Sequence, residues 1–270
     1  MPANNYMMET VKEVGSARCP AVDRPPTSEL PVILSASKIV KRFGSLTVVD
    51  HVDLSLRAGE AVGIVGPNGA GKTTLLGILA GAHAASAGTI TFRDVDVTEM
   101  GAADRCRLGV IRTHQIPRPF SGMTVFENVL VAATNGGGLA RSNANECCIE
   151  SLSLCGMMRV ANRRAETLGL LDRKRLELAR ALAANPSVLL LDEIGGGLTD
   201  AEAAELVAAI HSLVKRGVTI IWIEHIVHVL LQVTERLVCM DAGRVIADGT
   251  PREVLSDPTV VKAYLGGSAA

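Results

Sequence analysis

Residues 66–74 constrain the fold of this chain more than any other stretch. They fit G-x-x-x-x-G-K-[ST], the pattern of a loop that wraps a phosphate group. The apolar residues 60–65 before the loop predict a buried strand, and residues 74–81 after it predict a helix closed by a glycine. A chance glycine-rich turn is the other interpretation. The order strand, loop, helix favours a nucleoside triphosphate site.

The residue types in the loop suit phosphate chemistry. Glycines let backbone N–H groups turn toward phosphate oxygens, and the helix N-terminus adds partial positive charge. Lys72 adds a full charge, and the Thr73 hydroxyl suits Mg²⁺. We therefore expect the nucleotide to be held by Gly66, Pro67, Asn68, Gly69, Ala70, Gly71, Lys72, Thr73 and Thr74.

A second motif supplies acids. Four apolar residues, 188–191, predict a buried parallel strand, and Asp192 and Glu193 follow at its carboxyl end, where ligands bind in such sheets. Asp192 is expected to serve the Mg²⁺ site, and Glu193 to polarise the attacking water. A strand that simply ends in solubilising acids is the other interpretation. The absence of an N-K-x-D motif argues against a GTPase.

Composition sets broad limits. A chain of 270 residues with 48% hydrophobic content is sufficient for one large α/β domain, with or without a small subdomain. A net charge of −1 argues against a general surface for nucleic acid or anionic membrane. The six cysteines form no C-x-x-C pair, which favours reduced thiols in a cytosolic protein.

The chain divides into a tail and a body. Residues 1 to about 30 show no periodicity and are expected to form a disordered extension, without the layout of a signal peptide. Residues 218–233 are too short and too interrupted by charge to span a membrane. Lys72 and Asp192 are 120 positions apart, which exceeds the spacing of a minimal nucleotide fold. An inserted helical subdomain is therefore expected, with helices around 125–133, 145–154 and 171–184.

The order of motifs resembles the ATP-binding cassette subunits of membrane transporters. Within that family, the chain is similar to the ATPase subunits of importers for branched-chain amino acids and related amides. The similarity covers about residues 33 to 266. It rests on the run Arg112-Thr113-His114-Gln115, the helix Arg175-Leu176-Glu177-Leu178-Ala179-Arg180 and the ending Gly249-Thr250-Pro251 with Ala263-Tyr264-Leu265-Gly266.

The resemblance implies a fold and a set of residue roles. The fold class is α/β, a P-loop NTPase-type core sheet with an antiparallel β portion near residues 33–60 and 88–94 and a helical subdomain. The domain would span residues 32–268, with the subdomain at about 116–175 and an extension at 1–31. Phe43 falls where an aromatic ring stacks on adenine, although a core phenylalanine is the other interpretation. Gln115 matches the glutamine that touches Mg²⁺ or the lytic water, and His225 the histidine that contacts the γ-phosphate.

The resemblance also implies partners and a mechanism. ATP would close two cassettes, water would attack the γ-phosphate, and reopening would complete a cycle coupled to membrane subunits. The partners would be a second ATPase subunit, permease subunits and, indirectly, a solute-binding protein, at the cytoplasmic face of the membrane and without nucleic acid. Two alternatives remain: a degenerate regulatory cassette, or a soluble ATPase that takes no part in transport.

The chain departs from the family pattern in the segment that caps the partner's ATP. Where cassettes carry L-S-G-G-Q, this chain has Leu168-Gly169-Leu170-Leu171-Asp172. Gly169 thus replaces the serine, and Leu171 replaces the glycine at the fourth position of the motif. The Thr167 hydroxyl or a shifted helix start is a possible compensation. Ile194 replaces a proline, and Gly195-Gly196-Gly197 with Thr199 form an unusual loop after Glu193. We therefore expect a competent ATP half-site and a weaker signature face, which would make paired sites asymmetric.

Overall fold

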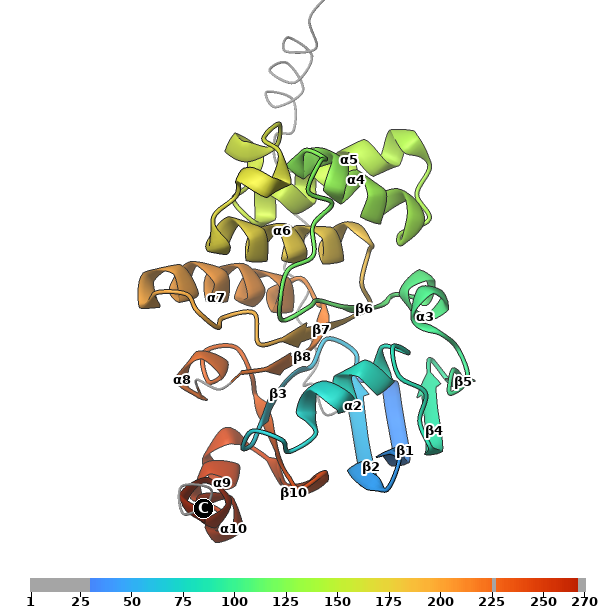
Figure 1. The fold of residues 1–270 in the computed structure, drawn as a ribbon, viewed down its shortest axis with the longest axis vertical. Coiled ribbons are helices and arrows are strands. Elements are labelled where there is room, and N and C mark those ends of the chain that lie inside the picture. Colours follow the sequence, from blue (N-terminus) through green and yellow to red (C-terminus); the bar gives the residue numbers. More distant parts are fainter. Residues whose placement is uncertain (1–29, 225–226, 267–270) are drawn as a thin grey trace, which may run out of the picture.

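The computed structural model describes residues 30–224 and 227–266. Figure 1 shows two sheets beneath a stack of helices. The smaller sheet is antiparallel and has the order β2-β1-β4-β5. Its strands are β1 (Val32–Phe43), β2 (Leu46–Arg57), β4 (Ala87–Phe92) and β5 (Val95–Asp96). The antiparallel portion predicted near residues 33–60 and 88–94 is therefore confirmed.

The larger sheet lies in the interior of the molecule and has the order β10-β9-β3-β8-β7-β6. Its strands are β3 (Ala61–Val65), β6 (Val110–Arg112), β7 (Val188–Asp192), β8 (Thr219–Ile223), β9 (Arg236–Asp241) and β10 (Arg244–Gly249). All pairs are parallel except β9 with β10. Every residue of β3, β7 and β8 is buried, because both faces of the sheet are covered.

Two separate apolar clusters lie on the two faces of this sheet. Strand residues alternate between them: Leu189 and Leu191 belong to one cluster, Val188 and Leu190 to the other. The first cluster also takes in α7 (Asp200–Lys215), and the second takes in α2 (Lys72–Leu79) and the antiparallel sheet. The core sheet is thus packed between α2 and α7, and the phosphate loop follows β3, an interior strand of this sheet.

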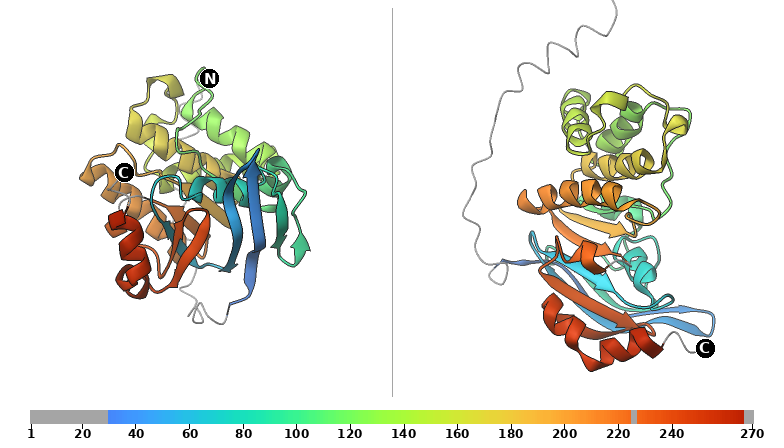
Figure 2. Two further views of the ribbon diagram at one scale, coloured as in Figure 1. Left: turned by 60° about the horizontal axis from the view of Figure 1, so that its bottom comes forward. Right: turned by 90° about the vertical axis from the view of Figure 1, so that its left-hand side faces the viewer.

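Three helices pack together at the end of the molecule away from the antiparallel sheet (Figures 1 and 2). They are α4 (Val125–Asn135), α5 (Arg141–Leu154) and α6 (Leu170–Ala183), with the short helices η2 (Met158–Val160) and η3 (Ala165–Thr167) between the last two. Thr124 starts α4 with a capping box to Glu127, and glycines follow its last residue. The expected helices are present, and the α/β fold class with a helical insertion is confirmed.

The remaining helices are short and surround the core. They are α3 (Ala102–Leu108), α8 (Val227–Leu230), α9 (Pro251–Ser256) and α10 (Pro258–Gly266). Among the described residues, no helix combines the length and the apolar character that crossing a bilayer requires. The N-terminal extension expected at residues 1–31 lies almost entirely outside the described residues.

Candidate functional site: a phosphate loop with a buried acid

The glycines of the loop are required by its shape. Three loop glycines have positive φ angles: +144° at Gly66, +82° at Gly69 and +93° at Gly71. Residues that carry a side chain rarely adopt such backbone angles. A Cβ atom at Gly66 would overlap the carbonyl oxygen of Met240 on β9, and one at Gly71 would lie 2.5 Å from the carbonyl oxygen of Val48. Neighbouring strands therefore press backbone against backbone here, and only glycine fits at these two positions.

Lys72 lies inside the loop that it closes. Its Nζ atom donates hydrogen bonds to the carbonyl oxygens of Gly66 at 2.7 Å and Pro67 at 2.9 Å, and only 5% of the residue is exposed. Burial lowers the pKa of this ammonium, while the negative charge of Glu193 opposes the shift. The loop therefore holds a cation that a phosphate group can neutralise.

Asp192 ends β7 and is fully buried. The Thr73 hydroxyl donates to its Oδ1 atom at 3.1 Å, and Arg112 Nη2 donates to its Oδ2 atom at 2.7 Å. The hydroxyl and the carboxylate, 119 residues apart in sequence, thus meet at one point. A cavity of about 170 Å³ opens beside them, lined by Thr73, Arg112, His114, Gln115, Ile116, Arg118 and Asp192. Hydroxyl and carboxylate oxygens next to open space are the donor set that Mg²⁺ prefers, so the residues present fit this ion.

Gln115, which lines this cavity, contacts Glu193. The Gln115 Nε2 atom donates to Glu193 Oε2. Glu193 itself has a φ angle of +48°, a conformation rare for a side chain of this size, and its backbone N–H donates to the Ile223 carbonyl oxygen at 3.0 Å. The carboxylate of Glu193 is thus held at the glutamine by a direct hydrogen bond. His225 lies outside the described residues.

Glu224, which precedes His225, has a structural environment. It is buried and accepts hydrogen bonds from the Gly195 N–H at 2.6 Å and the Trp222 Nε1–H at 3.1 Å. Burial raises the pKa of this carboxyl in spite of both bonds. Glu224 therefore anchors the glycine-rich segment that follows Glu193, and it does not touch the loop lysine or the buried aspartate.

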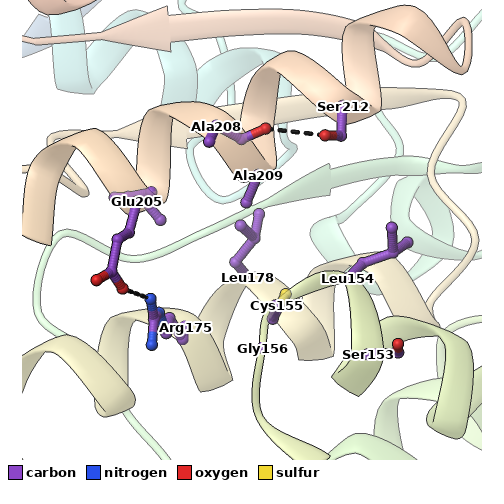
Figure 3. Close-up of a pocket in the computed structure, with 11 residues that line it drawn as sticks. Ser153, Leu154, Cys155, Gly156, Arg175, Leu178, Glu205, Ala208, Ala209 and Ser212 are labelled. Carbon is purple, nitrogen blue, oxygen red and sulfur yellow. Dashed lines mark hydrogen bonds and ion pairs between the residues drawn. The ribbon is translucent and has the colours of Figure 1, made fainter.

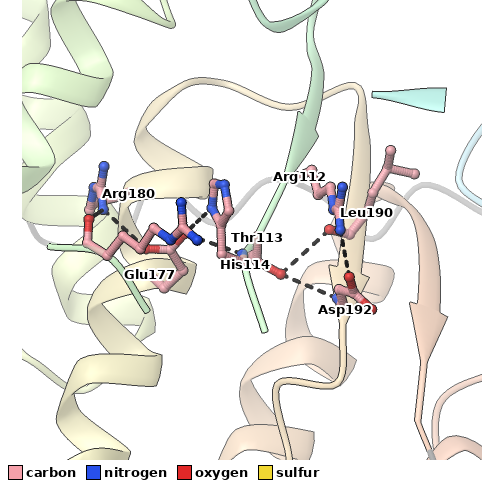
Figure 4. A network of polar contacts seen from close by, with 8 residues as sticks. Arg112, Thr113, His114, Glu177, Arg180, Leu190 and Asp192 are labelled. Carbon is pink, nitrogen blue, oxygen red and sulfur yellow. Dashed lines mark hydrogen bonds and ion pairs between the residues drawn. The ribbon is translucent and has the colours of Figure 1, made fainter. Parts of the chain in front are cut away.

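A polar network ties the segment before Gln115 to helix α6 (Figure 4). The His114 ring Nδ1 lies 2.9 Å from Glu177 Oε1, and Arg180 Nη1 donates to Glu177 Oε2 at 3.0 Å. Arg180 Nη1 also donates to the Arg118 carbonyl oxygen at 2.9 Å. Glu177 is buried; burial raises its pKa, but the hydrogen bond from His114 and the charge of Arg180 outweigh it, and the net pKa lies below its usual range.

Phe43 lies at the end of β1 with 48% of its surface exposed. Its ring meets the His83 ring edge to face, with centroids 6.0 Å apart, and Lys41 Nζ lies 4.9 Å from its centre. His83 in turn covers Gly77 of α2, since a Cβ there would lie 2.5 Å from the His83 ring. Phe43 is thus an exposed ring that contacts the phosphate-loop helix through His83. Stacking of adenine on it stays a prediction.

The segment at residues 168–172 begins helix α6. Gly169 is the N-cap residue, with a φ angle of −69°, and α6 starts at Leu170. The Thr167 hydroxyl donates to the Arg164 carbonyl oxygen at 2.8 Å, so in this structure it is bonded within its own turn. Leu171 lies in the first turn of the helix and is not among the residues with a positive φ angle, so its side chain causes no backbone strain there. The departures leave the fold intact but remove a hydroxyl.

A larger cavity, of about 360 Å³, lies between α6 and α7, away from the phosphate loop (Figure 3). Arg175 at its rim pairs with Glu205 of α7 and lies 4.0 Å from Asp172. The last residue of the altered segment is thereby linked to the core sheet's covering helix.

The comparisons with known proteins agree with this geometry. Residues 49–195 match the model of the ABC transporter family. The chain belongs to the ATP-binding cassette family. Residues 244–270 match a second model, that of the branched-chain amino acid ATP-binding cassette transporter. As a member of this cassette family, the protein is an ATP-binding ATPase.

Several cassettes are similar over nearly their whole length. The branched-chain amino acid transport ATP-binding protein LivG of Escherichia coli K12 is 36% identical over 249 residues, 87% of this chain and 98% of LivG. BraF of Pseudomonas aeruginosa, described by the same function, is 35% identical with equal coverage. A nucleotide-free cassette crystal structure is 31% identical, with a TM-score of 0.79 over 87% of this chain and 99% of that one.

The cassette site combines predicted residues with others that sequence reasoning passed over. Lys72, Thr73, Asp192, Gln115 and Glu193 lie together as expected. The contacts of His114, Glu177 and Lys174 were not anticipated; Lys174 is buried and donates to the Ile194 carbonyl oxygen at 2.8 Å. The available signal was two polar residues, Lys174 and Glu177, on the buried face of an amphipathic helix.

Proposed function

We propose that this chain is the ATP-hydrolysing subunit of an importer for branched-chain amino acids or related amides. ATP-driven closure of two cassettes would be coupled to the membrane subunits. The observation that carries the substrate class is the match of residues 244–270 to the branched-chain amino acid cassette model. A lipopolysaccharide export protein, LptB of Haemophilus influenzae, is also 32% identical, so the cassette core alone does not identify the cargo.

The chemistry follows from the polar groups around the loop. The Lys72 ammonium would exchange its hydrogen bonds to the carbonyl oxygens of Gly66 and Pro67 for bonds to the triphosphate. Its positive charge would then balance negative charge on the phosphate oxygens. Glu193 would accept a proton from the attacking water, with Gln115 orienting this carboxylate and His225 contacting the γ-phosphate. Thr73, Asp192 and Gln115 would hold Mg²⁺, which neutralises charge on the phosphate oxygens.

The assembly follows the same proposal. Residues 32–268 would form the ATP-binding domain, with the helical subdomain at about 116–175. A dimeric cassette structure with 22% identity and a TM-score of 0.74 shares the fold. The partners would be a second ATPase subunit and permease subunits, served by a solute-binding protein, and the chain would lie peripherally on the cytoplasmic face of the membrane.

One observation favours a second function, a mainly regulatory cassette. The N-cap of α6 carries no hydroxyl, so the face offered to a partner's ATP is poorer in hydrogen-bond donors. The complete set of groups around Lys72 and Glu193 argues for hydrolysis instead. Purified transporter complex should separate the two: a regulator predicts no ATP turnover with Mg²⁺ and the transported solute present.

Uptake by the reconstituted complex tests the proposed cargo. Proteoliposomes that contain the complex, its binding protein and internal ATP should accumulate labelled leucine, isoleucine or valine. Complex with Glu193→Gln in this chain should accumulate none above background. ATP turnover without stimulation by any of these amino acids, or by short amides, would contradict the substrate class while leaving the ATPase assignment standing.

A further inference from the structure

The Arg112 guanidinium is bonded to Asp192, the carboxylate that is proposed to serve Mg²⁺. Arg112 ends β6, which runs parallel to β7 with Arg112 opposite Leu190. Its guanidinium reaches past the strand end, and Nη2 donates to Asp192 Oδ2 at 2.7 Å (Figure 4). The Asp192 side chain is fully buried and the Arg112 side chain is 15% exposed. Arg112 therefore places a positive charge directly on a buried carboxylate whose other side-chain hydrogen bond comes from the neutral Thr73 hydroxyl.

The contact uses only one of the donors of Arg112. An arginine that binds a carboxylate most firmly offers two parallel N–H groups. Here Nη2 alone bonds to Asp192, and Nε is buried without a hydrogen-bond partner among the described residues. Nη1 extends toward α2 and lies 3.1 Å from where a Cβ of Gly77 would be. The pair balances charge but leaves the guanidinium incompletely satisfied, which makes it replaceable.

The same carboxylate faces the cavity beside the loop. Thr73 donates to Asp192 Oδ1, and both residues line this space together with Arg112 and Arg118. Mg²⁺ needs oxygen ligands in close, nearly octahedral contact and retains several waters. An arginine cation bonded to Oδ2 repels a divalent ion at this point and occupies a lone pair that the ion or its waters would use.

We propose that Arg112 is a positioning residue of the metal site, a resident counter-ion that competes with Mg²⁺ for Asp192. In the nucleotide-free chain it balances the buried carboxylate. Binding of Mg²⁺ with nucleotide displaces its guanidinium. The observed association constant for the metal is therefore the intrinsic constant multiplied by the fraction of molecules in which Arg112 has released Asp192. This inference rests on the metal site of the proposed function.

Three proteins test the competition: the unchanged chain, Arg112→Met and the matched control Arg118→Met. Both substitutions remove one positive charge from the lining of the same cavity, but Arg118 makes no side-chain bond to Asp192 in the described structure. The readout is the ADP dissociation constant measured by calorimetry in EDTA and in excess Mg²⁺, without hydrolysis. Arg112→Met should increase the enhancement by Mg²⁺ about fivefold or more, and Arg118→Met less than about twofold.

A second readout separates this role from simple packing. Without nucleotide and in EDTA, Arg112→Met should melt at a lower temperature than Arg118→Met, and Mg²⁺ with ADP should restore most of the difference. If Arg112→Met does not fold, Arg112→Gln keeps a hydrogen-bond donor for Asp192 without the charge, and it should show the same increase.

The results that overturn the proposal are distinct from failure of the metal site itself. Equal Mg²⁺ enhancement in Arg112→Met, or Arg112→Gln where only this folds, and in the unchanged chain would overturn the competition, and so would an equal increase in Arg118→Met. If ADP binds the unchanged chain equally well in EDTA and in Mg²⁺, the proposed metal site is wrong and the competition falls with it.

Discussion

The phosphate loop at residues 66–74 and the altered segment at residues 168–172 differ in what their glycines do. In the loop, Gly66 and Gly71 have positive φ angles, and neighbouring backbone fills the space that a side chain would need. In the altered segment, Gly169 has an ordinary extended backbone, and nothing lies within 4 Å of a Cβ built there. Packing therefore requires glycine at positions 66 and 71 of the loop, whereas it does not require glycine at position 169 of the altered segment.

This difference decides what a substitution can report. A change in the loop alters fold and binding together, because the same atoms serve both. A change at Gly169 leaves the fold intact, so the loss of the serine hydroxyl there acts on function alone. The weakness expected of the signature face is a loss of hydrogen-bond donors, since α6 starts directly after Gly169 and Leu171 is an ordinary helical residue.

The largest effect is expected from Gly66→Ala. The added methyl group overlaps the Met240 carbonyl oxygen at a φ angle of +144°, so the loop must move or the domain must open. We expect a loss of at least about 3 kcal/mol in the free energy of unfolding, or loss of ADP binding. Gly122→Ala, at a position with open space around it, is the control and should change neither. Urea unfolding and calorimetry of ADP binding measure both quantities; a stable Gly66→Ala protein that binds ADP normally would show that the loop is not fixed by packing.

A middle-sized effect is expected where the segment before Gln115 contacts α6, the helix that the altered segment begins. Glu177→Gln removes the charge that His114 and Arg180 share, and should lower the free energy of unfolding at pH 7 by about 1–3 kcal/mol. The pKa of Glu177 lies below its ordinary value in the folded chain, so its stabilisation is present above the unfolded pKa and is lost as pH falls through the folded pKa. The difference between the two proteins should therefore shrink in acid, below about pH 4.

Urea unfolding at pH 7, at pH 5 and at about pH 3 measures this difference on both sides of the ordinary glutamate pKa. The control is Glu150→Gln, which breaks an exposed ion pair with Arg216 and should cost under about 1 kcal/mol at every pH. If Glu177→Gln were as mild as the control, the polar network would not join the segment before Gln115 to α6.

The smallest effect on stability is expected from Gly169→Ser. The N-cap backbone already has the extended conformation that serine favours, so the free energy of unfolding should rise by only a few tenths of a kcal/mol, about the difference between these two caps. ATP turnover at the partner's half-site should increase, because the hydroxyl restores a donor for phosphate. An unchanged or lower turnover would show that Leu170 and Leu171, rather than the missing hydroxyl, limit this face.

The sequence predicted the local elements of this fold and the short-range part of the site. Periodicity and glycine positions placed the strand before the loop, the helices of the insertion and the acids after β7 to within a few residues. These features depend on neighbours in the chain. The loop pattern also carried its own geometry, since the three residues with required positive φ angles are its three glycines.

Contacts between distant segments were beyond sequence reasoning. Arg105 is buried and donates to the carbonyl oxygens of Ile78, Leu79 and Thr98, which completes the end of the phosphate-loop helix. Arg112 reaches Asp192 across 80 residues. Nothing in the local pattern of either arginine distinguishes it from a surface cation, because the partner is set by strand order and helix packing.

The central claim is that this chain carries a competent ATP half-site and offers its partner a weaker signature face. The most direct measurement is ATP turnover of the purified complex with Glu193→Gln in this chain, compared with the equivalent glutamate substituted in the second cassette. We expect a large loss from Glu193→Gln and a small loss from the substitution in the second cassette. Equal losses from the two substitutions would contradict it.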